Sequence, residues 1–349
     1  MNNYTDQIKE SASLTIDWNI LKNKTVMVTG VTGMIGLYFV DLIMYRNEKY
    51  ADNISIIGIG RDEKKSKERF GKYQGDLKFR FIKSDINEHI ACEIQCDYII
   101  HAASNTHPLQ YSSDPIGTIM TNVEGTKNVL EYAISHGARR VIFLSSVEIY
   151  GENRGDVDRF SEEYCGYIDC NTVRAGYPES KRLGEALCQA YIVAKNMDIV
   201  IARLSRTYGP TMQMSDSKAI AQFIKKASVG EDIAIKSKGD QLFSYTYVAD
   251  TVSAILYILL KGQCGEAYNV ADEKSDITLK DLSELIAKTA NTKVIFEMPD
   301  ATESKGYSKA TKATLDPGKL KGLGWKSIYD IDRGIRETLN ILNNIKNKR

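Results

Sequence analysis

A tyrosine and a lysine stand four residues apart in the segment GYPESKRLGE, at Tyr177 and Lys181. At this spacing two side chains share one face of a helix. A lysine cation beside a phenol favours the phenolate and lowers its pKa from about 10. Such a tyrosine can pass a proton to or from a substrate hydroxyl while a cofactor exchanges hydride. The chain has 20 Tyr and 46 Lys and Arg residues, so the pair alone fits a solvated surface equally well.

A serine that would complete this chemistry is Ser146, the last residue of the apolar segment RRVIFLSS. A strand that ends there would place the hydroxyl where it can hydrogen-bond the substrate oxygen that becomes a carbonyl. We therefore predict that Ser146, Tyr177 and Lys181 are catalytic, with Lys181 also holding the nicotinamide ribose.

A glycine-rich turn indicates where that cofactor would bind. In VTGVTGMIG the three glycines follow an apolar strand and open an amphipathic helix. Glycines in this context allow a tight turn and let backbone N–H groups approach a pyrophosphate at the helix N-terminus. The alternative is merely a tight strand-to-helix connection. We predict cofactor contacts at the turn and at the catalytic pair: Gly30, Gly33, Met34, Ile35, Gly36, Tyr177 and Lys181.

The end of the second strand bears on which cofactor binds. NAD sites usually present an Asp or Glu there, whereas NADP sites need a cation for the 2′-phosphate. The segment NISIIGIG is followed by Arg61, with Lys64 and Lys65 close behind, and no acid stands at the usual position. NADP(H) is therefore favoured, with NAD(H) as the alternative if Arg61 is an unrelated surface residue.

Composition excludes several classes of protein. The net charge is +1, from 46 basic and 45 acidic residues, so no global field attracts nucleic acid or an anionic membrane. The N-terminus lacks a signal-peptide pattern, and no uncharged stretch reaches the ~18 residues that span a bilayer, which predicts a cytoplasmic protein. The scattered Cys and His residues form no zinc pattern, so we expect no metal.

Apolar strands alternate with helical segments over most of the chain. Strands are expected in TVMVTG, NISIIGIG, KFRFIKSD, CDYIIHAAS, RRVIFLSS, DIVIARLS and EAYNVAD. This alternation predicts an α/β fold: a Rossmann, doubly wound parallel sheet with a smaller C-terminal lobe. We assign 1–205 to the NAD(P)-binding domain, with 249–275 returning to it, and 206–248 and 276–349 to the substrate-binding lobe.

The order and spacing of these motifs resemble the extended short-chain dehydrogenases/reductases that act on nucleotide sugars. The shared motifs are TGVTGMIG, Asp85-Ile86 after the third strand, HAAS at 101–104, SSVEIYG, YPESK and RTYGP at 206–210. The likeness is greatest to UDP-glucuronate decarboxylases and nucleotide-sugar dehydratases. It implies a nucleotide-activated sugar as ligand and a homodimer through the helices after Asn122 and from Tyr177. It also implies further cofactor contacts at Asp85, Ile86, Ala102, Ala103 and Ser104.

The resemblance gives Glu148 a role after the sugar has been oxidised. Relatives that eliminate water or lose carboxylate commonly carry Thr-x-Glu where this chain has Ser146-Val147-Glu148. Val147 stands where hexose 4,6-dehydratases often place an Asp that protonates the leaving hydroxyl. Glu148 is therefore a fourth predicted catalytic residue, without the complete apparatus for eliminating water.

Four predicted substrate-binding positions depart from the family pattern. Arg206 replaces an Asn, Thr211 replaces an Arg, and Phe243 stands where many relatives carry a phosphate-binding Arg. Lys312 falls near the place of another Arg. Arg206 and Lys312 would supply the lost cations to a pyrophosphate, or the substrate is not a standard UDP- or dTDP-hexose. Phe243 fits packing in the small lobe equally well.

Together these features predict an enzyme that oxidises a nucleotide-linked sugar transiently at C4 and then eliminates, epimerises or decarboxylates it. The alternative is an NADPH-dependent reductase of a nucleotide-linked keto sugar or ketose. A non-catalytic dinucleotide sensor is disfavoured because Ser146, Tyr177 and Lys181 are all present. The nucleotide base, the sugar and the stereochemistry cannot be read from these motifs.

Overall fold

The computed structural model of the protein describes residues 4–106, 108–297 and 310–346. Its helices are α1 (Tyr4–Ala12), α2 (Met34–Tyr50), α3 (Glu63–Phe70), α4 (Pro108–Ser113), α5 (Pro115–Ser135), α6 (Gly176–Lys195), α7 (Ala219–Ala227), α8 (Val248–Lys261), α9 (Leu279–Ala290), α11 (Gly318–Gly322) and α12 (Ile331–Lys346). Its strands are β1 (Thr25–Thr29), β2 (Ser55–Gly60), β3 (Phe79–Lys83), β4 (Tyr98–His101), β5 (Arg140–Ser146), β6 (Ile199–Leu204), β7 (Arg206–Tyr208), β8 (Ile233–Ile235), β9 (Leu242–Tyr247), β10 (Ala267–Val270), β11 (Asp276–Thr278), β12 (Val294–Phe296) and β13 (Lys312–Ala313).

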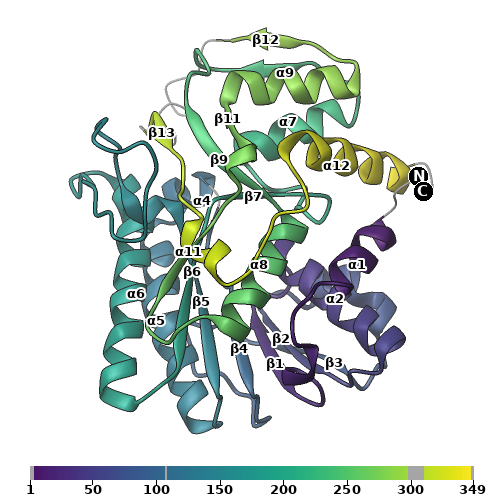
Figure 1. Ribbon diagram of the computed structural model, residues 1–349, viewed down its shortest axis with the longest axis vertical. Coiled ribbons are helices and arrows are strands. Elements are labelled where there is room, and N and C mark those ends of the chain that lie inside the picture. Colours follow the sequence, from purple (N-terminus) through teal and green to yellow (C-terminus); the bar gives the residue numbers. More distant parts are fainter. Residues whose placement is uncertain (1–3, 107, 298–309, 347–349) are drawn as a thin grey trace.

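A seven-stranded parallel sheet forms the centre of the larger part of the molecule (Figure 1). Its order is β10-β6-β5-β4-β1-β2-β3, so the chain winds outward from β1 to β3 and then returns to β4 beside β1. In such sheets ligands bind outside the carboxyl ends of the strands, where the winding reverses. The predicted doubly wound fold is confirmed, and its seven strands lie in the seven segments anticipated from the sequence.

Successive side chains of the central strands face two separate cores, because side chains alternate along a strand. Val26 and Val28 of β1 belong to one core and Met27 between them belongs to the other. Helices α2 and α8 supply the first core and helices α5 and α6 supply the second. Both faces of the sheet are therefore covered, which is why its strands are continuously apolar and its carboxyl ends are held in place.

Helix α5 illustrates how local sequence sets the boundaries of these elements. The Asp114 carboxylate accepts a hydrogen bond from the Gly117 N–H at 3.0 Å, and Pro115 occupies the first helical turn. The helix ends before Gly137, whose φ is 67°. An acidic N-cap, an early proline and a left-handed glycine beyond the end are the residues that start and stop helices.

Smaller sheets lie above the large one in Figure 1, together with α7, α9 and α12. Strand β9 pairs with β11, β13 and β7, and strands β8 and β12 form a separate parallel pair. The strands of the smaller sheets come from 206–247 and 276–313, and those of the large sheet come from 25–204 and 267–270. That these parts act as separate cofactor- and substrate-binding units stays a prediction. The chain ends, 1–3 and 347–349, belong to the predicted ranges of these units but lie outside the described residues.

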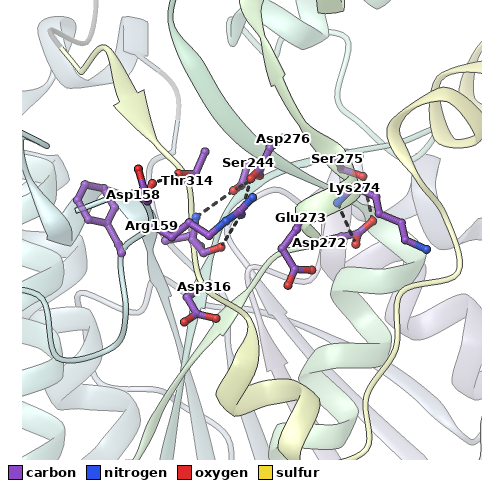
Figure 2. Close-up of polar contacts among 12 residues, drawn as sticks. Asp158, Arg159, Ser244, Asp272, Glu273, Lys274, Ser275, Asp276, Thr314 and Asp316 are labelled. Carbon is purple, nitrogen blue, oxygen red and sulfur yellow. Dashed lines mark hydrogen bonds and ion pairs between the residues drawn. The ribbon is translucent and has the colours of Figure 1, made fainter. Parts of the chain in front are cut away.

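Hydrogen bonds and an ion pair connect the two parts of the molecule at the loop around Phe160. The Phe160 N–H donates to the Thr314 carbonyl at 2.8 Å. Beside it, Arg159 forms an ion pair with Asp276, whose other oxygen accepts from the Ser244 hydroxyl at 2.5 Å (Figure 2). Burial raises the pKa of Asp276. Because backbone and side-chain bonds act together, strand β13 is held beside the loop that follows β5.

None of the helices in the described ranges combines the length and the apolar character that a bilayer crossing requires. Within the same ranges, no three His, Cys, Asp or Glu side chains come together where they could hold a metal ion. The expectations of a cytoplasmic location and of a metal-free protein stay predictions.

Candidate active site

The connection between β1 and α2 leaves no room for side chains. Gly30 has a φ of 65°, and a Cβ built there would lie 2.8 Å from the Cα of Ala103. A Cβ on Gly36 would lie 2.3 Å from the carbonyl oxygen of Val31. In both places the obstacle is backbone, which cannot move aside as a flexible side chain can. Glycine is therefore required at these two positions, as the strand, turn and helix pattern predicted.

The start of α2 presents backbone donors beside this turn. Gly33 is the N-cap residue, and the first N–H groups of the helix, including Met34 and Ile35, have no partner within the helix. Thr211, predicted to bind substrate, donates its hydroxyl to the Met34 carbonyl at 3.0 Å. Arg69 in turn donates to the Thr211 carbonyl at 2.5 Å. The structure thus places Thr211 against the glycine-rich turn.

The end of β2 presents Arg61 to solvent. Arg61 is 60% exposed, and Asp85 lies 3.8 Å away, between Nη1 and Oδ2. Asp62 follows it and is also exposed, but one of its carboxylate oxygens caps α3 by accepting from the Lys65 N–H at 2.9 Å. The Lys65 ammonium donates to Gln213 at 2.6 Å. Arg61 is therefore an exposed cation at this strand end, and its contact with a cofactor stays a prediction.

The HAAS segment lines the other side of the turn. The N–H groups of Ala102 and Ala103 both donate to the Thr29 hydroxyl at 3.1 Å. Ser104 donates to the Asn122 side chain at 2.7 Å. These bonds hold the backbone after β4 next to Gly30, where the predicted cofactor contacts of Ala102, Ala103 and Ser104 require it.

Asp85 and Ile86 follow β3 on the same side of the sheet. Asp85 accepts from the Asn87 N–H at 3.0 Å, which leaves its second oxygen facing Arg61. Ile86 is only 4% exposed, and its carbonyl accepts from the Asn128 amide at 2.9 Å. The side chain and the carbonyl of Ile86 are therefore engaged within the fold, and its contact with a cofactor stays a prediction.

His101 lies beneath this segment and gives the fold a dependence on pH. Both ring nitrogens have hydroxyl partners, Thr29 at 2.8 Å and Thr126 at 3.1 Å. Burial, with a smaller contribution from Lys181, lowers the pKa of His101 to about 3. The folded histidine stays neutral while an unfolded one takes up a proton below about pH 6.5.

The stabilising contribution of neutral His101 should be complete above pH 6.5 and disappear as the pH falls towards 3. The free energy of unfolding should fall in that window by up to ~1.4 kcal/mol per pH unit from this residue. Urea unfolding of wild type and of His101→Gln at pH 7.5, 6, 5 and 4.5 measures it. The variant should show a shallower slope, and equal slopes would contradict this role.

Tyr177, in the first turn of α6, lies with the two serines expected near it. The Ser146 and Ser104 hydroxyls lie close enough to favour its phenolate, and its ring stacks on Tyr111 at 4.7 Å between centroids. The pKa of Tyr177 is raised to about 12, because the ring is buried and the Glu148 carboxylate faces it, although both serines and Arg174 lower it in part. Tyr177 therefore holds its proton at neutral pH.

Lys181 lies one turn further along α6 and is buried. Its ammonium donates to the Leu144 carbonyl at 2.9 Å and sits 4.8 Å from the centre of the Phe143 ring. Burial lowers the pKa of Lys181 to about 8. The expectation that Lys181 brings the pKa of Tyr177 down is wrong for this structure, because burial of the phenol and the nearby Glu148 carboxylate raise it instead.

Glu148 has a cationic partner that the sequence analysis did not identify. Arg174 donates to the Glu148 carboxylate at 2.5 Å, and its guanidinium lies 4.8 Å from the centre of the Tyr111 ring. Tyr111 separates Arg174 from Tyr177. Arg174 precedes Tyr177 by three residues, a spacing that puts both on one face of a helical turn, so it could have been found. Tyr111 could not have been predicted from such a spacing, because it lies in a different helix.

Arg206 and Phe243, two of the predicted substrate-binding residues, lie against each other. The Arg206 guanidinium is 3.4 Å from the centre of the Phe243 ring. Both are on neighbouring strands, β7 and β9, which pair in parallel. Arg206 interacts electrostatically with Glu148 and Arg174, so it belongs to the same cluster as Tyr177.

Lys312 stands on β13, one residue before Ala313, which is paired with Phe243. Its ammonium lies 3.2 Å from the carboxylate of Asp158, which is fully exposed. The structure brings Lys312 to the strand next to Phe243 but gives it an acidic partner outside the Tyr177 cluster.

Comparison with known proteins agrees with this geometry. The profile of the "NAD dependent epimerase/dehydratase family" matches residues 26–271. UDP-glucuronic acid decarboxylase 6 of Arabidopsis thaliana is 32% identical over 317 residues, which cover 90% of this chain and 87% of that protein. UDP-glucuronic acid decarboxylase 1 of Xenopus tropicalis is 29% identical over 318 residues, 90% and 71% of the two chains.

Solved structures share the fold at lower identity. DesIV, a dTDP-glucose 4,6-dehydratase from Streptomyces venezuelae crystallised with NAD and TYD, superimposes with a TM-score of 0.79 at 22% identity, over 93% of this chain and 98% of that one. The UDP-glucose 4-epimerase of Thermotoga maritima gives 0.78 at 22% identity, over 92% and 99%.

Proposed function

The chain belongs to the NAD dependent epimerase/dehydratase family of nucleotide-sugar enzymes, and from this premise we propose that it oxidises its sugar transiently at C4. Elimination, epimerisation or decarboxylation then follows, and the cofactor is regenerated. Tyr177 transfers the proton, Ser146 binds the reacting oxygen and Lys181 holds the nicotinamide ribose.

The observation that carries this proposal is that the Ser146 hydroxyl, at the end of β5, lies close enough to the Tyr177 hydroxyl of α6 to lower its pKa. Two neighbouring hydroxyls can both bond one substrate oxygen, and the tyrosine then exchanges a proton with it. Lys181 contributes from the same helix, one turn away. Its role is to hold the nicotinamide ribose and not to lower the pKa of Tyr177, which burial and the Glu148 carboxylate raise.

A nicotinamide dinucleotide, when bound, supplies the hydride acceptor and donor. The residues around the β1–α2 turn fit its pyrophosphate, because side chains are excluded at Gly30 and Gly36 and the helix start offers backbone donors. The Ala102–Ser104 segment lies against Gly30 and would line the same space.

Two measurements test the proposal. The nucleotide released when the purified protein is denatured identifies the cofactor and its redox state. Incubation with UDP-glucuronic acid, UDP-glucose and dTDP-glucose, followed by mass spectrometry of the products, tests the reaction. An isomer, a product lighter by water or one lighter by carbon dioxide supports it, and consumption of NADPH with a product heavier by two hydrogens contradicts it.

The family is NAD-dependent, and we propose that this member prefers NADP(H). Support comes from Arg61, exposed at the end of β2, and from Asp62, whose carboxylate is already used as a helix cap. Lys65 and Arg69 add positive charge along α3, on the side that faces the 211–213 loop. A 2′-phosphate would find cations there, whereas the Asp62 carboxylate at the strand end is turned to capping α3.

Arg61→Ala should weaken NADP(H) by ~1–3 kcal/mol, the scale of a lost charge-assisted hydrogen bond, and leave NAD(H) nearly unchanged. Lys67→Ala is the matched control, since Lys67 is an exposed α3 cation that pairs with Glu63 at 3.1 Å. Fluorescence titration of both cofactors into the three proteins gives the result. Equal weakening of NADP(H) and NAD(H), or tighter wild-type binding of NAD(H), would overturn the preference.

One observation favours the reductase as second candidate. The pKa of Tyr177 is raised to about 12, so the ligand-free site holds a proton donor, which suits protonation of a carbonyl oxygen during reduction. The changed positions Arg206, Thr211 and Phe243 would also suit a substrate unlike those of the relatives.

We also propose that the protein is a homodimer through α5 and α6. Both helices, and the turn before α6, expose large apolar side chains to solvent. The most exposed are Ile116, Val173, Leu183 and Val193. Apolar groups gathered on two adjacent helices are typical of an interface.

A further inference from the structure

An excess of positive charge lies next to the proposed catalytic tyrosine. The cluster comprises Arg174, Arg206, Glu148, Tyr111 and Phe243, and we call it the paired-arginine site. Tyr111 connects it to Tyr177 through stacked rings. Arg174 pairs with the Glu148 carboxylate, which also interacts electrostatically with Arg206.

Several donors of these arginines have no hydrogen-bond partner among the described residues. Arg174 uses Nη2 for Glu148, while its Nε and Nη1 are buried and unsatisfied. The Nη1 of Arg206 is also buried and unsatisfied. Buried polar groups in native proteins are almost always bonded, and buried charges are paired.

Two other arginines with low exposure show the usual arrangement. Arg46 reaches Asp52 at 2.6 Å and Arg203 reaches Glu185 at 2.7 Å. The half-buried Arg159 is paired with Asp276, as Figure 2 shows. Arg206, like Arg69, forms no ion pair with a carboxylate within the described ranges and has a buried donor without a partner, but Arg206 lies in the cluster beside Tyr177.

Phe243 fixes the direction of the Arg206 guanidinium. The ring lies 3.4 Å from the guanidinium carbon, so it holds the guanidinium flat on its face. Burial lowers the pKa of Arg206, and a bound anion would oppose that effect. Strand β7 therefore supplies a cation, Arg206, at a place where the neighbouring strand β9 supplies only the aromatic ring of Phe243.

We propose that Arg174 and Arg206 together bind an oxyanion of the substrate, a phosphate or carboxylate group. Planar guanidinium groups suit such oxyanions because they donate two bonds in one plane. The ion would occupy the unsatisfied Arg174 and Arg206 donors, so Glu148 can keep its bond to Arg174 Nη2. This inference rests on the proposed function, since it names what the substrate must carry to that site.

The test is isothermal titration of cofactor-loaded wild type, Arg206→Met, Arg206→Lys and Arg154→Met. The ligands are inorganic pyrophosphate, UDP, UDP-glucose and UDP-glucuronic acid. Methionine keeps an apolar contact with Phe243 without the charge. Arg154 is the matched control, an exposed arginine over the Tyr167 ring at 4.4 Å that already lies 3.7 Å from Glu152. Melting temperature and cofactor affinity verify that each variant is folded.

Arg206→Met should weaken binding about 10- to 100-fold, as expected for one lost charge-assisted hydrogen bond. Arg206→Lys should recover part of the lost affinity, and Arg154→Met should bind the ligands like wild type. If Arg206→Met binds all four ligands more weakly, the pyrophosphate is the anion that is bound. If it binds only UDP-glucuronic acid more weakly, the anion is a group on the sugar. Both outcomes support the proposal.

Unchanged affinity of Arg206→Met for every ligand that wild type binds would overturn it, and so would equal weakening in Arg154→Met. The inorganic pyrophosphate titration separates this proposal from the proposed function. Wild type that binds pyrophosphate through Arg206 but no nucleotide sugar would retain the oxyanion site and refute the substrate assignment.

Discussion

Tyr177→Phe should lower turnover by ~10²–10⁴ and leave the protein folded with its cofactor affinity unchanged. The substitution removes only the hydroxyl whose pKa the nearby Ser146 and Ser104 hydroxyls lower. The ring remains, so its stacking on Tyr111 at 4.7 Å is preserved. Loss of activity with retained structure is the result that a proton-transferring residue requires.

Steady-state turnover, circular dichroism and cofactor titration together check this prediction. Tyr191→Phe is the matched control. Tyr191 lies on the same helix, far along α6 from Tyr177, and its hydroxyl bonds Glu131. The control should retain wild-type turnover. If Tyr177→Phe turned over at the wild-type rate, the proton would have to come from another group.

The second large effect is expected for Glu148→Gln, about 10²-fold or more on the step that follows oxidation. A keto group acidifies the neighbouring C–H, and a carboxylate can remove that proton. With glutamine in its place, hydride transfer should survive and the later step should stall. Single-turnover absorbance should then show reduced nicotinamide accumulating with a competent nucleotide sugar.

The structure adds a second readout for the same variant. The Glu148 carboxylate raises the pKa of Tyr177, so its removal should lower that pKa. Oxidation of the sugar needs the phenolate as base, so the rise of hydride transfer with pH should move to lower pH. A merely structural Glu148–Arg174 pair would lower the melting temperature without stalling one step. A reductase has no later step, and steady oxidation of added NADPH without build-up would favour that alternative.

The strand, glycine-rich turn and helix of the cofactor half could be read directly from the sequence. Their signals are local: the apolar run of β1, the glycines before α2 and the acid and proline that begin α5 all lie within a few residues of what they determine. The alternation of such units implies a parallel sheet, because a right-handed crossover leaves few other topologies. Tyr177 and Lys181 share a face of α6 for the same local reason.

The electrostatic state of those residues could not be read in that way. Whether a buried phenol is acidic depends on how much water surrounds it and on charges brought from elsewhere in the chain. For Tyr177 the desolvation and the Glu148 carboxylate, which raise its pKa, outweigh Arg174 and the two serine hydroxyls, which lower it. The spacing to Lys181 alone suggested the opposite direction.

The substrate end of the site was decided by tertiary structure as well. The sequence showed that Arg206, Phe243 and Lys312 were unusual, but not that the first two would stack while Lys312 pairs with Asp158. These contacts join β7, β9 and β13, strands separated by tens of residues, and the register between them has no local signal. The sequence by itself therefore determined the fold and the position of the Tyr177–Lys181 pair. Only the packed structure decided which charges are paired, and hence where an oxyanion would be bound, because pairing depends on distance and burial rather than on order along the chain.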